Sequence, residues 1–397
     1  MSCCGFHGGR CGSVARYVLI SCIGGIGILL LAEAVAWGIS PGRYRNPPAV
    51  TADAWISSDA LSGADTVWMK EFVNEFCDSY VARWRSYVYF QRVPFTGRHI
   101  NVDSAGLRYT PQFKTDSSPP ALTIALLGGS TMWGTGSRDS GTIPSALARL
   151  IAADPDFPPA RVVNMGETGY VSTQGLLALE LELRKGNVPD VVILYDGVND
   201  IFSAYQNGVA GLPQNEAHRA AEFNLLKDGG RTRALGISDL WKRTLTAGVL
   251  DTLRHLLAPT PPPPEPDPRL PAEILKLYKG NIEILEALSR QFGFAYLACW
   301  QPVVFSKSDP SPYERRQSDL WHYVRPLFEE TYRLVEADPI LRSNPRFHNL
   351  AGILDGPPAY LDFCHVTEDA NAVIAGAILG DLKRLRIGPR ITHDSPR

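Results

Sequence analysis

A serine stands directly after an apolar segment and two glycines, in the stretch ALTIALLGGSTMWGTGS at residues 121–137. Glycines before a serine suit a sharp turn that exposes the hydroxyl group, which becomes nucleophilic when a nearby base removes its proton. The stretch does not fit a phosphate-binding loop, because no Gly-Lys-Ser/Thr follows. It does not fit a GxSxG elbow either, because Met132 stands where the second glycine should be. A nucleophile at Ser130 and a plain tight turn remain as the two interpretations.

A histidine near the end of the chain is the candidate base. His365 follows Asp362 by three residues in DFCH, and a one-turn loop would bring the carboxylate to the Nδ1 atom of the histidine. A carboxylate in that place holds the tautomer and stabilises the imidazolium that forms during attack. Two metal ligands, or an aspartate that caps a helix, would give the same pattern. The sequence has no further His/Asp cluster to support a metal, so we expect no metal here.

Acyl transfer also needs hydrogen-bond donors for the oxyanion that forms on the attacked carbonyl. Gly169, in NMGETGY, can offer a backbone N–H from a turn that a side chain would crowd. Asn199, in DGVND, can offer its side-chain amide, and Ser130 can offer its own N–H. Each has an ordinary alternative, since a glycine suits any tight turn and an asparagine suits a local turn or a helix cap.

Apolar segments that read as strands precede the first three of these motifs, and the fourth precedes a closing helix. Strands are predicted at residues 122–127, 161–166, 190–197, 293–302 and 346–354, and helices at 141–155, 172–187 and 367–385. Strands that alternate with helices indicate an α/β sandwich around a parallel sheet. Functional groups of such a sheet gather at the carboxyl ends of its strands, so the four motifs are expected to converge there.

The stretches GGST, VVNMGETGYVSTQGL, DGVND and DFCHVT, in this order, resemble the four sequence blocks of the SGNH hydrolases, also called GDSL-type esterases. The resemblance covers residues 122–200 and 293–385. It implies a flavodoxin-like three-layer α/β/α sandwich and serine-dependent ester chemistry without a cofactor. It also implies a catalytic triad of Ser130, His365 and Asp362. The implied oxyanion hole consists of Ser130, Gly169 and Asn199.

The first block departs from the family pattern, which usually reads Gly-Asp-Ser-Leu. Here Gly129 and Thr131 flank Ser130, so the carboxylate that commonly braces the nucleophile turn is missing. Asp196 or Asp200, in the third block, is a candidate to replace it.

The N-terminal part of the chain has a different composition. The run from Val18 to Ala32 carries no charge, and continued to Ile39 it would span ~30 Å of hydrocarbon as one helix. Small residues after the run also fit a signal-peptide cleavage site. We expect a single-pass membrane protein with its catalytic domain on the extracytoplasmic side. The predicted parts are a cytoplasmic tail (1–17), an anchor or signal segment (18–39), an accessory region (40–118) and an SGNH hydrolase-type domain (119–390) with an insertion at about 201–290.

Within the accessory region, apolar and charged residues at helical spacing predict a helix in residues 67–90, and residues 97–110 read as short strands and turns. The net charge of −2 and the lack of a basic stripe argue against a nucleic-acid partner.

The predicted activity is hydrolysis of an acyl ester such as an O-acetyl ester, with an acylated glycan or lipid as the substrate. One alternative is that the same catalytic residues transfer the acetyl group to a cell-envelope polysaccharide, so that the protein is an O-acetyltransferase. A more distant alternative is a noncatalytic envelope module on the same fold. Trp133 and Trp300 would suit a glycan-binding surface, but they suit the core of the protein equally well.

Overall fold

The computed structural model describes residues 52–113, 122–216, 219–220 and 267–386, and the single positions Gly25, Gly27, Leu31 and Ala34. The chain divides into two compact units, Met1–Pro47 with Arg219–Pro263 and Pro48–His218 with Pro264–Arg397. All helices and strands named below belong to the second unit. The predicted tail (1–17) lies outside the described residues, as does the predicted anchor (18–39) except for the four single positions, which are helical. Among the described residues, no helix combines the length and the apolar character needed to cross a bilayer.

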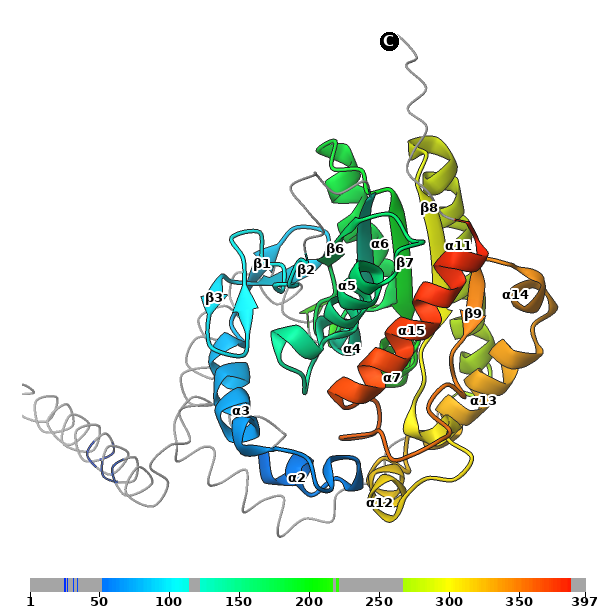
Figure 1. Ribbon diagram of the computed structural model, residues 1–397. Coiled ribbons are helices and arrows are strands. Elements are labelled where there is room, and N and C mark those ends of the chain that lie inside the picture. The colour runs from blue at the N-terminus through cyan, green and yellow to red at the C-terminus, as the bar shows by residue number, and fades with distance from the viewer. Residues whose placement is uncertain are drawn as a thin grey trace, which may run out of the picture. The chain divides into compact units, whose positions relative to one another are not determined.

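A five-stranded parallel sheet lies at the centre of this unit, in the order β6-β5-β7-β8-β9 (Figure 1). Its strands are β5 (Leu122–Gly128), β6 (Ala160–Asn164), β7 (Val191–Asp196), β8 (Ala295–Trp300) and β9 (Phe347–Asn349). Strand β7 is buried along its whole length, as its continuous apolar run requires in a sheet covered on both faces. Because β5 pairs with both β6 and β7, the strand order reverses at β5, and the carboxyl end of such a strand is where these folds bind ligands. The predicted α/β fold with a parallel sheet is confirmed.

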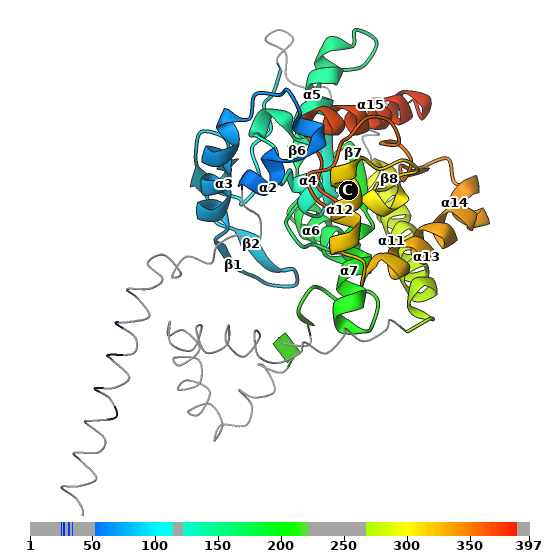
Figure 2. The same ribbon diagram turned by 90° about the horizontal axis from the view of Figure 1, so that it is seen from below.

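Helices cover both faces of the sheet (Figures 1 and 2). One face carries α5 (Ile143–Ala153) and α15 (Glu368–Arg384), and the other carries α6 (Ser172–Arg184), α7 (Val198–Asn207), α11 (Leu270–Phe292) and α13 (Arg325–Ala337). Thr367 caps the first turn of α15, which is acidic, and its last turn is basic, as the helix dipole favours. Shorter elements are η2 (Asp139–Gly141), η3 (Val304–Ser306), α12 (Pro312–Leu320) and α14 (Pro339–Ser343).

Two of these helices, α7 and α11, overlap the predicted insertion at about 201–290. Helix α7 contributes Ile201 and Ala204 to the main hydrophobic core, and α11 contributes Ile274 and Leu285. An amphipathic helix must bury its apolar stripe, and these two do so in the core of the sandwich. Residues 221–266 lie outside the described residues.

The described part of the accessory region packs on the sandwich through a small core of its own. Its elements are α2 (Ala52–Ile56), η1 (Asp59–Leu61), α3 (Val67–Ser79), the antiparallel hairpin β1 (Ala82–Arg85) and β2 (Tyr89–Arg92), and the pair β3 (Phe95–Thr96) and β4 (Asn101–Val102). The helix predicted across residues 67–90 is therefore wrong in its second half. Aromatic and β-branched side chains dominate that half and favour strands, and Tyr87 and Tyr89 turn the chain at positive φ. Trp55 and Phe72 of this core pack with Trp133 and Leu361 of the sandwich.

Candidate active site

The three residues predicted to act together form a hydrogen-bonded chain in the structure. His365 Nε2 lies 2.8 Å from Ser130 Oγ, and His365 Nδ1 lies 2.7 Å from Asp362 Oδ2. Ser130 begins α4 (Ser130–Trp133), a single turn directly after β5, and the other two residues lie in the loop before α15. These distances are within the reach that proton transfer between a hydroxyl and an oriented imidazole requires.

The carboxylate of Asp362 is fixed by its own loop. Its Oδ1 accepts hydrogen bonds from the backbone N–H groups of His365 at 2.8 Å and of Cys364 at 2.9 Å. Burial alone would raise the pKa of Asp362, but the charge of His365 and the hydrogen bonds from the loop bring that pKa below its ordinary value. Asp362 is therefore ionised at neutral pH, and its carboxylate accepts the hydrogen bond from His365 Nδ1 that orients the imidazole ring.

The two other predicted oxyanion residues lie against the nucleophile turn. Asn199 Nδ2 donates a hydrogen bond to the carbonyl oxygen of Tyr170 at 2.8 Å. Gly169 has φ of 79°, a left-handed conformation that glycine adopts without strain. A Cβ atom built on Gly129 would lie 2.0 Å from Asn199 Nδ2 and 3.3 Å from Tyr170 O. The amide of Asn199 and the turn at Gly169–Tyr170 therefore both reach the residue before the nucleophile.

This packing explains why an aspartate is missing from the first block. Real Cβ atoms essentially never approach another heavy atom within 3.0 Å, so any side chain at Gly129 would displace the amide of Asn199. Thr131 stands where the family pattern has a leucine. Its Oγ1 atom accepts a hydrogen bond from Gln301 Nε2 at 3.3 Å, which a leucine could not accept.

Neither aspartate of the third block braces the nucleophile turn, so this expectation is wrong. Asp200 accepts hydrogen bonds from the N–H of Ser172 at 3.1 Å and from its hydroxyl at 2.5 Å, at the start of α6. Burial raises the pKa of Asp200 to about 6, although the hydrogen bonds from Ser172 oppose the rise. Burial, and then the charge of Asp200, raise the pKa of Asp196 well above its ordinary value. The Oδ2 atom of Asp196 has no hydrogen-bond partner among the described residues.

The nucleophile turn is held instead by two side chains that the sequence reasoning did not single out. Asn164, the last residue of β6, donates to the carbonyl oxygens of Met132 at 3.1 Å and Trp133 at 3.3 Å. Arg108, from the accessory region, donates to the same carbonyl oxygen of Trp133 and to those of Gly134 and Ser137. Asn164 lies within the second family block, which is a signal that could have identified it. Arg108 belongs to no motif.

Two groups of side chains among the described residues offer three potential metal ligands each: Asp362, Cys364 and His365, and Glu71, Glu75 and His99. In the first group, burial raises the pKa of the Cys364 thiol well above its ordinary value, and the other two side chains already pair with each other. In the second, the carboxylate of Glu75 accepts hydrogen bonds from three consecutive backbone N–H groups. Both groups fit structural hydrogen bonding, and we assign a metal to neither.

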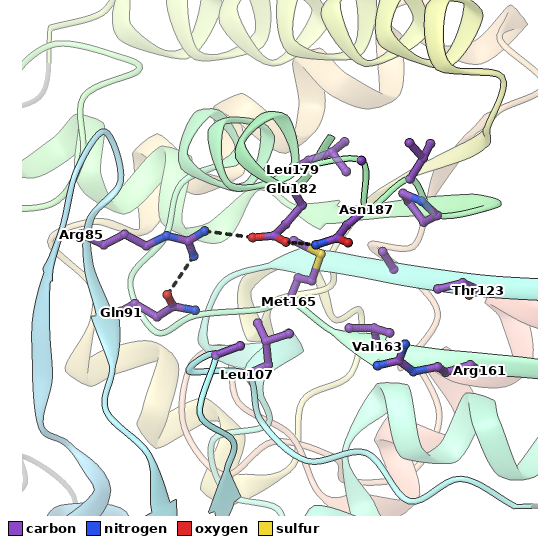
Figure 3. A pocket seen from close by; sticks show the side chains of 15 residues that line it. Arg85, Gln91, Leu107, Thr123, Arg161, Val163, Met165, Leu179, Glu182 and Asn187 are labelled. Atoms are coloured by element: carbon purple, nitrogen blue, oxygen red, sulfur yellow. Dashed lines mark hydrogen bonds and ion pairs between the residues drawn. The ribbon is translucent and has the colours of Figure 1, made fainter. Parts of the chain in front are cut away.

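A cavity of about 500 Å³ lies between the β1–β2 hairpin, strands β5 and β6, and the end of α6 (Figure 3). Four of its charged or polar side chains bind one another: Arg85 lies 3.3 Å from Glu182 and 2.9 Å from Gln91, and Glu182 also accepts from Asn187. No residue of the triad or of the oxyanion hole lines this cavity. We therefore give it no part in the reaction.

Residues 126–322 match the model of the GDSL-like lipase/acylhydrolase family. The match begins in β5, just before Ser130, and extends over Gly169 and Asn199. The chain therefore contains a GDSL-like lipase/acylhydrolase domain, and the protein is a carboxylic ester hydrolase.

No curated protein matches this sequence. Similar solved structures include an acetylxylan esterase from Geobacillus stearothermophilus, with 12% identity over 66% of this chain and 94% of that chain and a TM-score of 0.33. An α/β hydrolase from the metagenome of Lake Arreo, Spain, has 16% identity, coverages of 68% and 98%, and a TM-score of 0.35. TesA has 16% identity, coverages of 66% and 99%, and a TM-score of 0.35.

Proposed function

We propose that the protein hydrolyses acyl esters with Ser130 as nucleophile, His365 as general base and Asp362 as the carboxylate that orients the base. The hydrogen-bonded chain from Ser130 Oγ through His365 to Asp362 Oδ2, with links of 2.8 and 2.7 Å, is the observation that supports this most. In the first step the hydroxyl attacks the ester carbonyl, while His365 takes its proton and passes it to the leaving alcohol. Water then attacks the acyl-serine with His365 again as base, and the carboxylic acid leaves.

We propose three donors for the oxyanion: the backbone N–H groups of Ser130 and Gly169, and Nδ2 of Asn199. An amide nitrogen carries two hydrogens, and in Asn199 one of them is directed to Tyr170 O, which leaves the second for the substrate. The existing bond holds the amide in place before substrate arrives, so little reorganisation is needed during reaction. Loss of one such donor typically costs ~2.7–4 kcal/mol of transition-state stabilisation.

The direct test replaces the nucleophile. Ser130→Ala should reduce turnover of p-nitrophenyl acetate to the background rate and abolish covalent labelling by a fluorophosphonate, while the circular dichroism spectrum stays unchanged. Ser140→Ala is a matched control, because Ser140 is exposed and lies ten residues further along the same segment. Turnover by Ser130→Ala equal to that of the unaltered protein would exclude the proposed mechanism.

The tryptophans considered for glycan binding do not form a surface. The side chains of Trp133 and Trp300 are both 0% exposed, so they belong to the core.

Partly exposed aromatic side chains lie next to the site instead. Phe202 and Tyr205 follow Asn199 at three-residue intervals, so one face of α7 carries all three side chains. Trp321 packs on Phe363 of the triad loop and on Phe202, with ring centroids 4.5 and 5.8 Å apart. Aromatic rings with a polar tip suit an apolar sugar face that carries hydroxyl groups at its rim. These rings support an acylated glycan as the substrate.

Kinetics on two acetyl esters test the glycan substrate. Trp321→Ala should raise KM for a partially O-acetylated oligosaccharide and leave KM for glyceryl triacetate unchanged, since only the sugar would stack on the ring. Trp84→Ala, on the exposed accessory hairpin, is the control. Equal effects on both esters would contradict a glycan subsite. Adding unacetylated oligosaccharide to a p-nitrophenyl acetate reaction distinguishes the two acceptors, because acetylated oligosaccharide forms only if the acyl group is transferred to a sugar rather than to water.

The membrane anchor also remains a proposal, supported by the charge-free run from Val18 to Ala32. The full chain should stay with the membrane pellet after extraction at alkaline pH, and a variant lacking residues 1–39 should not. Full-length protein in the supernatant would contradict the anchor.

A further inference from the structure

We infer that Arg108, a residue of the accessory region, is a positioning residue for Ser130 and takes over the support that the family's usual aspartate gives to the nucleophile turn. This inference rests on the proposed function of Ser130. It assigns to the accessory region a part in catalysis that the sequence blocks do not indicate.

The guanidinium of Arg108 binds three carbonyl oxygens in the segment after the nucleophile. Its Nη1 donates to Trp133 O at 3.1 Å and to Gly134 O at 2.6 Å, and its Nη2 donates to Ser137 O at 2.6 Å. Its Nε donates to Asp139 Oδ1 at 3.0 Å. The side chain is fully buried, and Asp139 supplies the opposite charge that a buried guanidinium needs.

The geometry of the turn explains why an arginine is needed. Gly134 and Gly136 have φ of 98° and 86°, so the chain leaves the helical conformation after α4. Of the three carbonyl oxygens that Arg108 binds, only that of Gly134 also accepts a backbone N–H from this turn, that of Ser137 at 3.1 Å. A guanidinium offers five donors in a rigid plane and can bind several carbonyl oxygens at once. A lysine offers one nitrogen atom with three hydrogens and cannot span the same set of acceptors.

The bound carbonyl groups are directly coupled to the nucleophile. The backbone N–H groups of Gly134 and Thr135 both donate to the carbonyl oxygen of Ser130, at 2.9 and 3.0 Å. Any shift of the segment bound by Arg108 therefore passes to the backbone of Ser130. The hydroxyl must stay within hydrogen-bond reach of His365, and a misplacement of about 1 Å can cost about a hundredfold in rate.

A second arginine of the accessory region extends this support to the Gly169 turn. The guanidinium carbons of Arg92 and Arg108 lie 3.9 and 4.2 Å from the ring centroid of Trp133, the last residue of α4. The backbone N–H of Arg92 donates to Glu167 Oε2 at 3.0 Å, and its Nε to Glu167 Oε1 at 3.4 Å. The N–H of Glu167 in turn donates to Gly128 O. The two arginines thus connect the nucleophile turn with the segment that leads to Gly169.

The test separates positioning from folding by measuring kcat per labelled active site. Arg108→Lys should lower kcat for p-nitrophenyl acetate about tenfold to a hundredfold with KM little changed, and should slow fluorophosphonate labelling in the same proportion. Arg108→Ala should lose more activity, and added guanidinium ion should restore part of kcat where an equal concentration of ammonium does not. Arg85→Met is the matched control. It removes another accessory arginine, which binds Glu182 of α6 and Gln91 of β2 rather than the nucleophile turn.

Two results would overturn the inference: an Arg108→Lys protein with unaltered kcat per labelled site, or one whose kcat falls no further than that of Arg85→Met. If Arg108→Ala does not fold, Arg108→Lys decides alone. Failure of the proposed function would be seen elsewhere, as continued turnover and labelling of Ser130→Ala. The two failures are therefore distinguishable.

Discussion

Replacing Gly129 by alanine should impair catalysis far more than stability. The new Cβ would lie 2.0 Å from Asn199 Nδ2, so the amide must move by more than an ångström to reach ordinary contact distance. That movement breaks its 2.8 Å hydrogen bond to Tyr170 O and takes the proposed oxyanion donor out of place. The backbone itself is not strained, because Gly129 has φ of −85°.

The magnitudes of the two effects differ. Loss of an oxyanion donor costs ~2.7–4 kcal/mol, or about a hundredfold to a thousandfold in kcat. Loss of one hydrogen bond costs about 0.5–1.5 kcal/mol of folding free energy, and the lower chain entropy of alanine in the unfolded state returns about 0.4–1 kcal/mol. We therefore expect kcat for p-nitrophenyl acetate to fall at least a hundredfold while the melting temperature changes by only a few degrees.

A double-mutant cycle identifies the cause. If Gly129→Ala acts by displacing Asn199, the double variant with Asn199→Ala should be no slower than Asn199→Ala alone. Gly175→Ala is the control, because a Cβ there would meet Leu127 at an ordinary 3.5 Å. The reasoning is refuted if Gly129→Ala keeps full kcat, or if its effect adds to that of Asn199→Ala.

Two further predictions concern the carboxylates. Asp362→Asn should leave the fold intact but lower kcat by several orders of magnitude, because an amide at this position favours the wrong tautomer of His365; a loss below tenfold in steady-state assays would argue against the orienting role. Asp200 should make stability fall as pH rises. Its pKa is about 6 in the folded chain against 3.8 for the ordinary group, so the folded state binds the proton more tightly. The resulting contribution of Asp200 to the free energy of unfolding is about 3 kcal/mol. It is fully present below pH 4 and is lost as the pH rises through 6. Urea midpoints measured between pH 4 and 7 should decline less steeply in Asp200→Asn, and an equal slope in both proteins would contradict the assignment.

The sequence predicted the parts of this protein whose information is local. Strand β7 has an unbroken apolar run, and α5 and α15 have clear caps, so their positions follow from burial and helix-end chemistry. The hairpin at Ala82–Arg92 was mistaken for a helix, because the charged and apolar residues there fit both the period of a helix and the period of a strand. Packing against the sandwich decides between the two structures.

Predictions at the site divide in the same way. Ser130, Asp362 and His365 could be grouped because their order along the chain matches a family pattern, and the structure places them within hydrogen-bond reach. The support of the nucleophile turn by Arg108 could not be predicted, since this side chain binds backbone carbonyl oxygens at least 25 positions away. Every residue has a backbone carbonyl group, so the sequence does not mark the ones that a side chain binds. Because Gly129 stands where the family usually has an aspartate, the sequence suggested that another carboxylate replaces it. The structure instead shows the amide of Asn199 next to Gly129.

The accessory region also bears on the relative position of the two catalytic loops. Its small core includes one residue from each: Trp133, three positions after the nucleophile, and Leu361, directly before Asp362. Arg138, just beyond the nucleophile turn, binds Glu368 at the start of α15, and its guanidinium lies 4.4 Å from the ring of Trp68 in α3. The distance between Ser130 and His365 therefore depends on packing by α3 and the neighbouring strands as well as on the sheet. We therefore propose that the described accessory region belongs to the catalytic architecture, because without it the loops that carry Ser130 and His365 would each lose an apolar contact.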